Sequence, residues 1–307
     1  MDKLTNYIPK QLIYYFTCDT WEFYEVYKLH LECIKSYGNI FFKYTFILGF
    51  NDLNDTEFIE YWKNTINEYI DASNKNIEYI IEQNNPLFRE GIHYYNYIYK
   101  HLNDFDGLLC WGHSKRDFKY PKDNIYKWIS FSHYIMSSNI PDVENKLMYD
   151  KYLYIGPNLG FNPFNANENY EYLGSFYWMN PKKIYNYYQN EINTFINYID
   201  SYLDNRQAFF DYINDPEYDL NTDDILYYIA EHNNTLIDLN YLYHYQYNLV
   251  DVFAIRSKNV DCERLMCKHD FYDGDALTYI INDYYNEEIV NNFYIYYNNI
   301  LDNINAS

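Results

Sequence analysis

Two side chains that can bind an anion follow a short apolar run in the first half of the chain. Residues 107–115 read GLLCWGHSK, which places His113 and Lys115 directly after the run. Because they are two positions apart, both side chains can point to the same side of an extended segment. A lysine at a strand end is a good partner for phosphate, and a histidine can hydrogen-bond a phosphate or a sugar hydroxyl. The pattern indicates a site for a phosphorylated ligand; two solvated loop residues are the simpler alternative.

A second stretch, residues 172–178, interrupts an aromatic strand pattern with two small residues. It reads YLGSFYW, with Gly174 and Ser175 directly before Phe176. Glycine inside a strand often marks a place where a ligand or another backbone approaches closely. The two stretches together raise the question of whether they form one site.

Acidic pairs that could hold a divalent cation occur in the pattern D-x-D. Such pairs can bind a cation against a diphosphate through hard oxygen ligands. With 44 Asp and Glu in the chain, chance matches are expected. Asp104 and Asp106 precede a predicted strand, which favours a turn, and Asp273 and Asp275 precede a predicted helix, which favours capping. We therefore assign no metal-binding residue.

Patterns for nucleophilic catalysis and for dinucleotide binding do not occur in the sequence. It contains no G-x-S-x-G, no glycine-rich phosphate loop and no G-x-G-x-x-G. With nine Gly in the chain, Rossmann-type dinucleotide binding is not expected. Of the five cysteines, Cys33 and Cys110 lie in apolar runs and read as reduced core residues, and a zinc site at Cys262, Cys267 and His269 would need a further ligand or two.

The composition argues against several classes of partner. The formal net charge is −21 and no run of Lys or Arg exceeds two residues, which opposes binding to nucleic acid or to anionic membrane surfaces. No uncharged run approaches the ~18 residues that a membrane span needs. The amino-terminal residues also lack the apolar core of a secretion signal, so we expect a cytoplasmic protein. Aromatic residues make up 22% of the chain. The coding bias of an A/T-rich genome explains such a high share of aromatic residues. A single aromatic residue is therefore weak evidence that a ligand stacks on it.

Alternating strand and helix patterns fill the first hundred residues. Apolar runs that predict buried strands alternate with segments whose apolar residues recur at helical spacing. This order predicts a mostly parallel sheet with helices on both faces, and ligands of such sheets bind beyond the carboxyl ends of the strands. The predicted strands are 11–18, 44–50, 76–82 and 107–111, and the predicted helices are 21–37, 55–70 and 89–102.

The remaining residues predict shorter strands and then helices. A helix over 125–137, strands over 152–155 and 172–179, a loop over 156–169 and a helix from Pro181 complete an α/β domain at residues 1–200. Residues 201–307 predict a mainly helical carboxyl-terminal extension packed on that domain. Its expected helices are 191–203, 206–213, 223–232 and 277–301.

Four segments in this order resemble one family of enzymes. They are residues 12–38, 89–115, 125–136 and 170–184, which contain the first strand and helix, the segment ending in H-x-K, a Trp-containing helix, and the G-S-F-Y-W segment. Together they resemble the GT-A-type glycosyltransferases of surface polysaccharide synthesis that carry an H-x-K-G motif and a later G-N-F-W-W motif. The resemblance covers roughly residues 10–200 and implies a GT-A-like fold.

The resemblance implies a nucleotide-sugar site at the strand ends. By motif position, His113 and Lys115 would face the donor diphosphate, and Thr17 and Cys18 would lie near the nucleotide. Further implied residues are Glu90 and Arg116 at the donor, Gly174, Ser175, Phe176 and Trp178 in the pocket for sugar and acceptor, and Asp211 and His113 as catalytic groups.

Three positions depart from the family pattern. Arg116 stands where H-x-K-G has its glycine, and Ser175 and Tyr177 replace the Asn and first Trp of G-N-F-W-W. The family's helix with an Arg followed by a Glu has a counterpart in Arg206 and Asp211, at shifted spacing and with a different acid.

The sequence therefore predicts a glycosyltransferase that moves a sugar from a nucleotide-sugar donor, with a UDP-sugar favoured, to a hydroxyl of a glycan or protein acceptor. His113, Lys115 and Arg116 would supply the positive charge that other enzymes take from a metal, although Mn²⁺ or Mg²⁺ stays open as a cofactor. The alternative is a catalytically degenerate subunit that binds sugar nucleotide or glycan in an assembly system.

Overall fold

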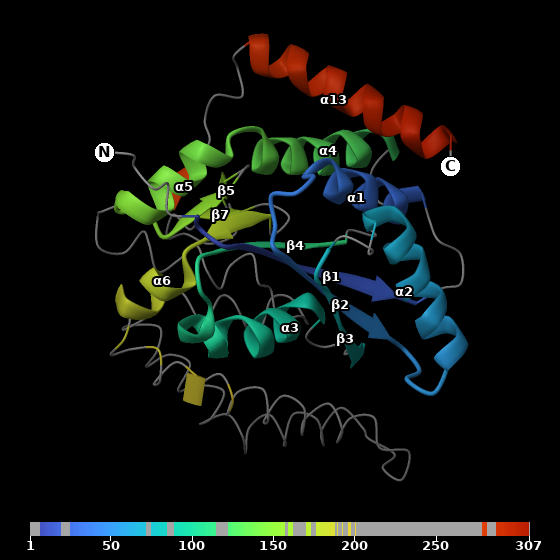
Figure 1. The fold of residues 1–307 in the computed structure, drawn as a ribbon, viewed down its shortest axis with the longest axis horizontal. Coiled ribbons are helices and arrows are strands. Elements are labelled where there is room, and N and C mark those ends of the chain that lie inside the picture. Colours follow the sequence, from blue (N-terminus) through green and yellow to red (C-terminus); the bar gives the residue numbers. More distant parts are fainter. Residues whose placement is uncertain are drawn as a thin grey trace, which may run out of the picture.

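Three buried strands and one partly exposed edge strand, β3 (Ile77–Gln83), form the first parallel part of a central sheet (Figure 1). The computed structural model describes residues 7–19, 25–71, 75–84, 89–114, 122–156, 159–161, 170–172, 176–187, 189, 192, 196–197, 200, 278–280 and 287–306. The parallel strands are β1 (Lys10–Cys18), β2 (Lys43–Phe50), β3 and β4 (Leu108–His113).

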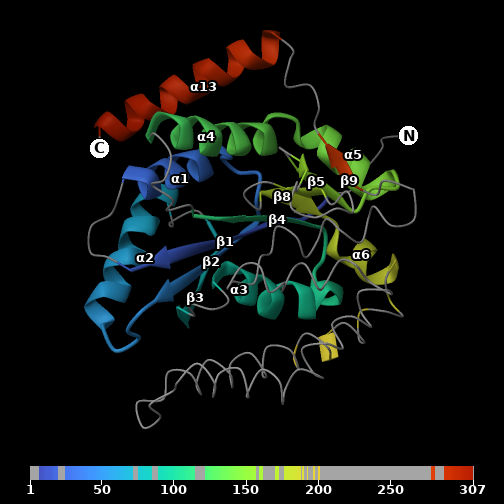
Figure 2. The ribbon, with the colours of Figure 1, turned by 180° about the vertical axis from the view of Figure 1, so that it is seen from behind.

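The order of the strands differs from their order in the chain. Within the described residues the sheet has seven strands in the order β3-β2-β1-β4-β8-β5-β9. Strand β8 runs antiparallel to both of its neighbours, whereas β5 and β9 pair in parallel (Figure 2). The added strands are β5 (Tyr154–Gly156), β8 (Tyr177–Met179) and β9 (Thr278–Ile280), and a separate pair consists of β6 (Leu159–Phe161) and β7 (Tyr170–Tyr172).

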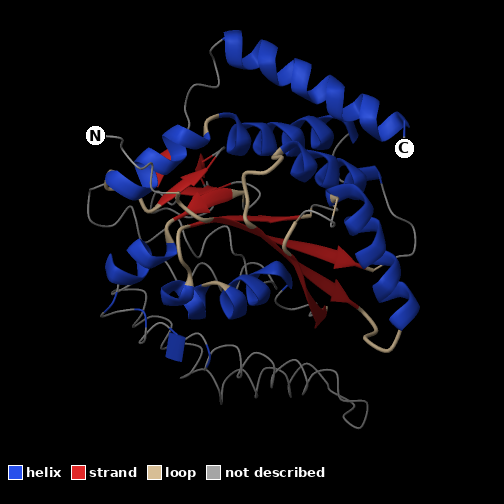
Figure 3. Ribbon diagram, in the orientation of Figure 1, coloured by secondary structure: helices blue, strands red, loops and turns tan. Residues whose placement is uncertain are grey.

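Helices cover both faces of the sheet, as the sequence predicted (Figure 3). One face packs against α1 (Glu25–Ser36), α2 (Thr56–Ile70), α4 (Lys122–Ser138) and α13 (Glu287–Ala306). The other face packs against α3 (Arg89–Tyr97), the 3₁₀ helix η2 (Tyr99–Asp104) and α6 (Pro181–Tyr187). Helix α5 (Ile140–Tyr149) lies beside β5.

Strand β1 shows why this part of the sheet forms. Its residues are almost all buried, because helices cover both faces and leave no polar side. Tyr14 packs into the core on the α1 side and Tyr15 into the core on the α3 side. Successive side chains of a strand point to opposite faces, so one apolar run supplies both cores.

Helix α2 shows how local residues set the ends of a helix. The side chain of Asp55 accepts a hydrogen bond from the Phe58 amide, so Asp55 caps the amino terminus. Asp71 ends the helix in the left-handed conformation, at φ 52°. The buried face consists of Phe58, Ile59, Trp62, Ile66 and Ile70, at helical spacing.

Several predicted elements have different bounds in the structure. The strand predicted over 172–179 divides into the end of β7 and strand β8, and the loop predicted over 156–169 contains β6. Helix α5 follows α4 directly and was not predicted. The helix predicted over 277–301 begins instead at Glu287, after strand β9. The helices predicted over 206–213 and 223–232 lie outside the described residues.

Helix α13 lies along α1 and α4 (Figures 1 and 2). Phe293 is 7% exposed, and its ring centroid lies 5.2 Å from that of Phe131 on α4. Tyr296 shares a hydrogen bond of 3.0 Å with Ser36, and Asn303 donates to the carboxylate of Glu32. Residues from the carboxyl-terminal end of the chain therefore complete the core over α1 and α4. None of the helices in the described ranges is long and apolar enough to span a membrane.

Replacing Phe293 with alanine tests this packing. We expect Phe293→Ala to lower the free energy of unfolding by about 3 kcal/mol, because a buried aromatic ring is lost and a cavity remains. Urea denaturation measures the change. Ile295→Ala on the same helix is the matched control, since Ile295 is 61% exposed, and should change stability by less than about 0.5 kcal/mol. Equal effects of the two substitutions would contradict the packing of α13.

Candidate functional site

The point where the strand order reverses lies between β1 and β4. The chain builds β1, β2 and β3 in one direction, and β4 then pairs in parallel with the other side of β1. The carboxyl ends of β1 and β4 therefore lie side by side at this point, and the helices that follow them, α1 and α4, cover the same face of the sheet. In open α/β sheets, ligands bind at this switch point. It is the place where the sequence put Thr17, Cys18 and His113.

The ends of β1 and β4 are tied together by Ser114. Its amide donates to the Tyr15 carbonyl at 2.8 Å, and its hydroxyl oxygen accepts from the Thr17 amide at 3.3 Å. The carbonyl of Thr17 in turn accepts from the Tyr27 hydroxyl at 3.1 Å. Ser114 thus continues the pairing one residue beyond β4 and holds the two strand ends in register.

Cys18 is fully buried at the end of β1. Its thiol lies 3.6 Å from the Phe16 carbonyl, and burial raises the thiol pKa well above its ordinary value. The thiolate is the reactive form of cysteine, so Cys18 is a packing residue here rather than a nucleophile.

The two stretches singled out in the sequence lie side by side. Strands β4 and β8 pair antiparallel, with Trp111 opposite Tyr177 and Cys110 opposite Trp178. The Phe176 ring, directly before β8, stacks on the His113 imidazole with centroids 6.1 Å apart and planes 14° apart. GLLCWGH and FYW therefore meet at the switch point. This answers the question that their sequences raised.

Gly112 makes this close approach possible. A Cβ atom at position 112 would lie 2.6 Å from the Tyr14 ring and 3.2 Å from the Phe176 ring. Since both rings are buried, a side chain at this position would have to displace them. The packing of these two rings beneath β4 thus requires a glycine at position 112.

Trp178 has a different environment from the one its motif implied. Its side chain is fully buried, and its indole N–H donates to the Met136 carbonyl of α4 at 2.9 Å. The ring also stacks on Phe41, with centroids 5.3 Å apart. Trp178 therefore packs in the core and offers no exposed ring face to a sugar. Phe176 is also buried, at 2% exposure.

Other implied residues are placed only in part. Glu90 is the second residue of α3. Lys115, Arg116, Gly174, Ser175 and Asp211 lie outside the described residues.

A buried polar network lies beneath His113, and the sequence analysis did not identify it. The Tyr14 hydroxyl lies 2.6 Å from His30 Nδ1, 3.1 Å from the His113 carbonyl oxygen and 3.4 Å from His133 Nε2. The Tyr37 hydroxyl lies 2.9 Å from His133 Nδ1. His30 and His133 come from α1 and α4, the helices that follow β1 and β4. The available signal was a histidine inside each apolar helix face, in LHLEC and in SFSHYIM.

A second polar network lies at the carboxyl ends of β2 and β3. The Tyr15 hydroxyl donates to Asn84 Oδ1 at 3.0 Å, and Asn84 Nδ2 donates to Asn51 Oδ1 at 3.0 Å. The His93 imidazole of α3 stacks on Tyr15 with centroids 4.6 Å apart, and its buried Nε2 has no hydrogen-bond partner among the described residues. Burial lowers the His93 pKa to about 4, so the ring is neutral at pH 7.

The acidic pairs do not supply a metal site at this edge. Asp104 ends η2 and Asp106 pairs with Lys182 at 3.2 Å, both before the start of β4 and so at the opposite edge of the sheet. The pair Asp273 and Asp275 lies outside the described residues. In the described part of the chain, no group of three or more His, Cys, Asp and Glu could hold a metal ion.

Comparison with known proteins gives no relative. No protein-family model matches the chain, and no curated protein sequence matches it significantly. The functional interpretation therefore depends on the residues and their geometry.

His93 and His133, which are neutral in the folded protein, predict a loss of stability in acid. Burial lowers the His133 pKa to about 3 and the His93 pKa to about 4, from 6.5. The unfolded chain therefore binds more protons than the folded chain between about pH 3 and 6.5, and the free energy of unfolding falls as the pH falls through this window. Between pH 7.5 and pH 5 we expect a loss of about 2 kcal/mol per histidine.

Urea denaturation at pH 7.5 and at pH 5 measures the loss. In His133→Gln the change in stability between the two pH values should shrink by the contribution of one histidine. His101→Gln controls for the removal of a histidine, because the His101 side chain is 53% exposed. If His133→Gln and the wild type show the same pH dependence, His133 is not held neutral in the folded state.

Proposed function

We propose that this chain is a glycosyltransferase that transfers a sugar from a nucleoside diphosphate sugar, with a UDP-sugar favoured, to a hydroxyl of a glycan or protein. One observation carries the proposal. The GLLCWGH and FYW stretches meet at the carboxyl end of β4, beside the carboxyl end of β1, where the strand order reverses and where a parallel sheet binds a ligand. The fold supports it further, because a mostly parallel sheet with helices on both faces is what the resemblance implies.

The reaction requires a base and a group that stabilises the leaving diphosphate. The bond between the sugar C1 and the diphosphate oxygen breaks, a bond to the acceptor oxygen forms, and the acceptor proton passes to a carboxylate. By the resemblance, Asp211 is that carboxylate. His113, Lys115 and Arg116 are the groups that offset the charge of the departing diphosphate.

A divalent cation does not fit the described residues of this edge. Mg²⁺ and Mn²⁺ prefer oxygen ligands, and paired carboxylates are the usual donors. Strand β4 ends at His113, and Ser114 follows it. The His113 imidazole nitrogen Nδ1 contacts the Ser114 carbonyl oxygen, and the Ser114 hydroxyl oxygen accepts from the Thr17 amide. The proposal therefore assigns the diphosphate to protein cations and derives no step through a metal.

A sugar-nucleotide-binding or glycan-binding subunit without turnover is the second candidate. The burial of Trp178 favours it, because this residue of the G-N-F-W-W pattern offers no surface to an acceptor. The shifted spacing of Asp211 points the same way. The two candidates share the donor site and differ in the chemical step.

Nucleotide binding tests what the two candidates share. UDP at 100 times its Kd should stabilise the protein by about 2.7 kcal/mol, measured as a rise in melting temperature, and GDP should have a smaller effect. Lys115→Ala should weaken UDP binding by about tenfold or more, because a charge-assisted contact to phosphate is lost. Lys127→Ala, an exposed lysine of α4, is the matched control. The absence of any shift with millimolar UDP, GDP or their sugars, with or without Mn²⁺, would refute the donor site.

Turnover then separates the two candidates. If the chain is an enzyme, it should release UDP from a UDP-sugar, and Asp211→Asn should reduce the rate by about 10²- to 10⁴-fold without changing the Kd of UDP. Full turnover in Asp211→Asn would remove Asp211 as the base. UDP binding without any turnover across the UDP-sugars would establish the binding subunit.

A further inference from the structure

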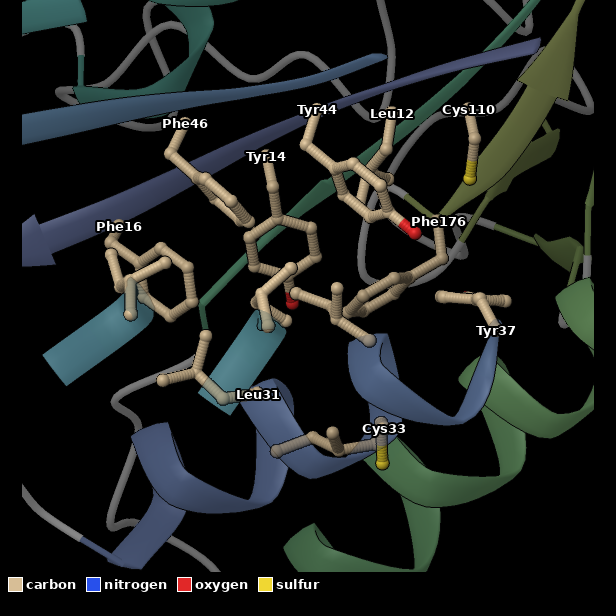
Figure 4. Packing of buried hydrophobic residues seen from close by; sticks show 14 of the residues in the cluster. Leu12, Tyr14, Phe16, Leu31, Cys33, Tyr37, Tyr44, Phe46, Cys110 and Phe176 are labelled. Carbon is tan, nitrogen blue, oxygen red and sulfur yellow. The ribbon is translucent and has the colours of Figure 1, made fainter. Parts of the chain in front are cut away.

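The buried polar groups beneath His113 form one connected network of hydrogen bonds. The network contains the side chains of Tyr37, His133, His30 and Tyr14, and it ends on the His113 main-chain carbonyl. Figure 4 shows Tyr14, Tyr37 and Phe176 pointing into the layer between the sheet and helices α1 and α4. Since every one of these side chains is nearly or fully buried, each polar hydrogen must point at a protein acceptor.

The proton on His133 follows from Tyr37. Within the described residues, the Tyr37 hydroxyl has one hydrogen-bond partner, His133 Nδ1, at 2.9 Å. The hydroxyl hydrogen must therefore point at Nδ1, because a buried hydroxyl without an acceptor is costly. Burial keeps the His133 ring neutral by lowering its pKa to about 3, so Nε2 carries the proton. That proton can be donated to the Tyr14 oxygen, 3.4 Å away.

The proton on His30 follows from the His113 carbonyl. A carbonyl only accepts, so the contact of 3.1 Å between the Tyr14 and His113 oxygens uses the Tyr14 hydrogen. The short contact of 2.6 Å between Tyr14 and His30 then needs a proton on His30 Nδ1. The alternative gives the Tyr14 hydrogen to His30 and leaves two oxygens facing each other without a hydrogen. The first arrangement satisfies all the contacts of Tyr14. It leaves the contact of 3.4 Å between His30 Nδ1 and His133 Nε2 without a hydrogen bond, because both nitrogens then carry a proton.

We propose that His30, His133 and Tyr14 are positioning residues that hold the His113 carbonyl, and with it the end of β4, at the switch point. The Tyr14 hydroxyl accepts one hydrogen bond from each histidine and donates its own hydrogen to His113. Helix α1 follows β1 and helix α4 follows β4, so the network joins the helices that follow the two strands on either side of the switch point. A substitution in the network acts on the ligand through His113 and Ser114.

The surroundings of the network support a neutral, fixed arrangement. The titratable groups that face Tyr14 and Tyr37 are the thiols of Cys33 and Cys110 and the hydroxyl of Tyr296, and burial raises the pKa of each. The Phe176 ring is 5.0 Å from His133 and 6.2 Å from His30, centroid to centroid, which closes the network on the β8 side. The charged group closest to this set among the described residues is the Glu32 carboxylate of α1, which acts on Cys33 and Tyr296 and is bonded to Lys35 and Asn303.

The tautomers of the two histidines test the arrangement without any ligand. Nitrogen-15 NMR of the imidazoles, assigned with His30→Gln and His133→Gln, should show His30 protonated on Nδ1, and His133 neutral at pH 6 and protonated on Nε2. An Nε2-protonated His30 would overturn the proposal, since Tyr14 could then not donate to His113. A stoichiometric transition metal in the purified protein would overturn it as well, because a metal would take the place of these protons.

The positioning role has its own test, and only its binding arm depends on the proposed function. Tyr14→Phe removes the hydroxyl, and amide hydrogen exchange at Ser114 should become at least tenfold faster. Tyr44→Phe is the matched control, because the Tyr44 hydroxyl also donates to a main-chain carbonyl, that of Gly38, away from the ends of β1 and β4. The control should lower the melting temperature comparably but leave exchange at Ser114 unchanged. Equal exchange at Ser114 in the two variants would reduce Tyr14 to a stabilising residue.

The binding arm measures the Kd of UDP. Tyr14→Phe should weaken UDP binding about tenfold, and Tyr44→Phe should not change it. An unchanged Kd in Tyr14→Phe, with binding intact in the wild type, would refute the link to the site. If the wild type does not bind UDP, the proposed donor site fails, while the tautomers and the exchange rates still decide the positioning role.

Discussion

The parallel pairing of β1 with a strand on each side is the constraint on which the structure depends. Residues 11–18 of β1 bond to β2, and Lys10 to Tyr15 are in register with β4. Because the chain reaches β4 only after building β2 and β3, this one strand fixes the switch point. The apolar run that makes β1 a buried central strand therefore also decides where a ligand can bind.

The adjacent tyrosines of β1 connect each face of the sheet to that edge. Tyr14 bonds to histidines of α1 and α4, and Tyr15 bonds to Asn84 and stacks on His93 of α3. Each ring needs space that a glycine of a neighbouring strand supplies. A Cβ at position 49 would lie 2.8 Å from the Tyr15 hydroxyl and 2.2 Å from Asn84 Oδ1. In a chain with nine Gly, two of them thus serve the packing around these tyrosines.

The parallel half of the sheet was predictable because its signals are local. Strands β1, β2 and β4 are mostly apolar runs and β3 is a mixed one, whereas the helices between them repeat their apolar residues at another period, so the change of period marks each boundary. The pairing of β8 with β4 depends on contacts between residues 70 positions apart, which no local pattern encodes. The same holds for Tyr14, His30 and His133: each histidine sits on an apolar helix face, and only the fold brings the two rings to one hydroxyl. His113 could be singled out because it ends an apolar run, whereas the burial of Trp178 could not be read from its motif.

The charge of the chain limits how the edge can hold a diphosphate. With a net charge of −21, the protein repels an anion at long range, and salt screens this repulsion beyond about 8 Å. Local groups must therefore provide the attraction. His93 and His133 are neutral at pH 7, and Tyr15, Asn84 and Ser114 offer hydrogen bonds without charge. Under the proposed function, the positive charge comes from Lys115 and Arg116, which follow β4 in the sequence, together with His113 at its end.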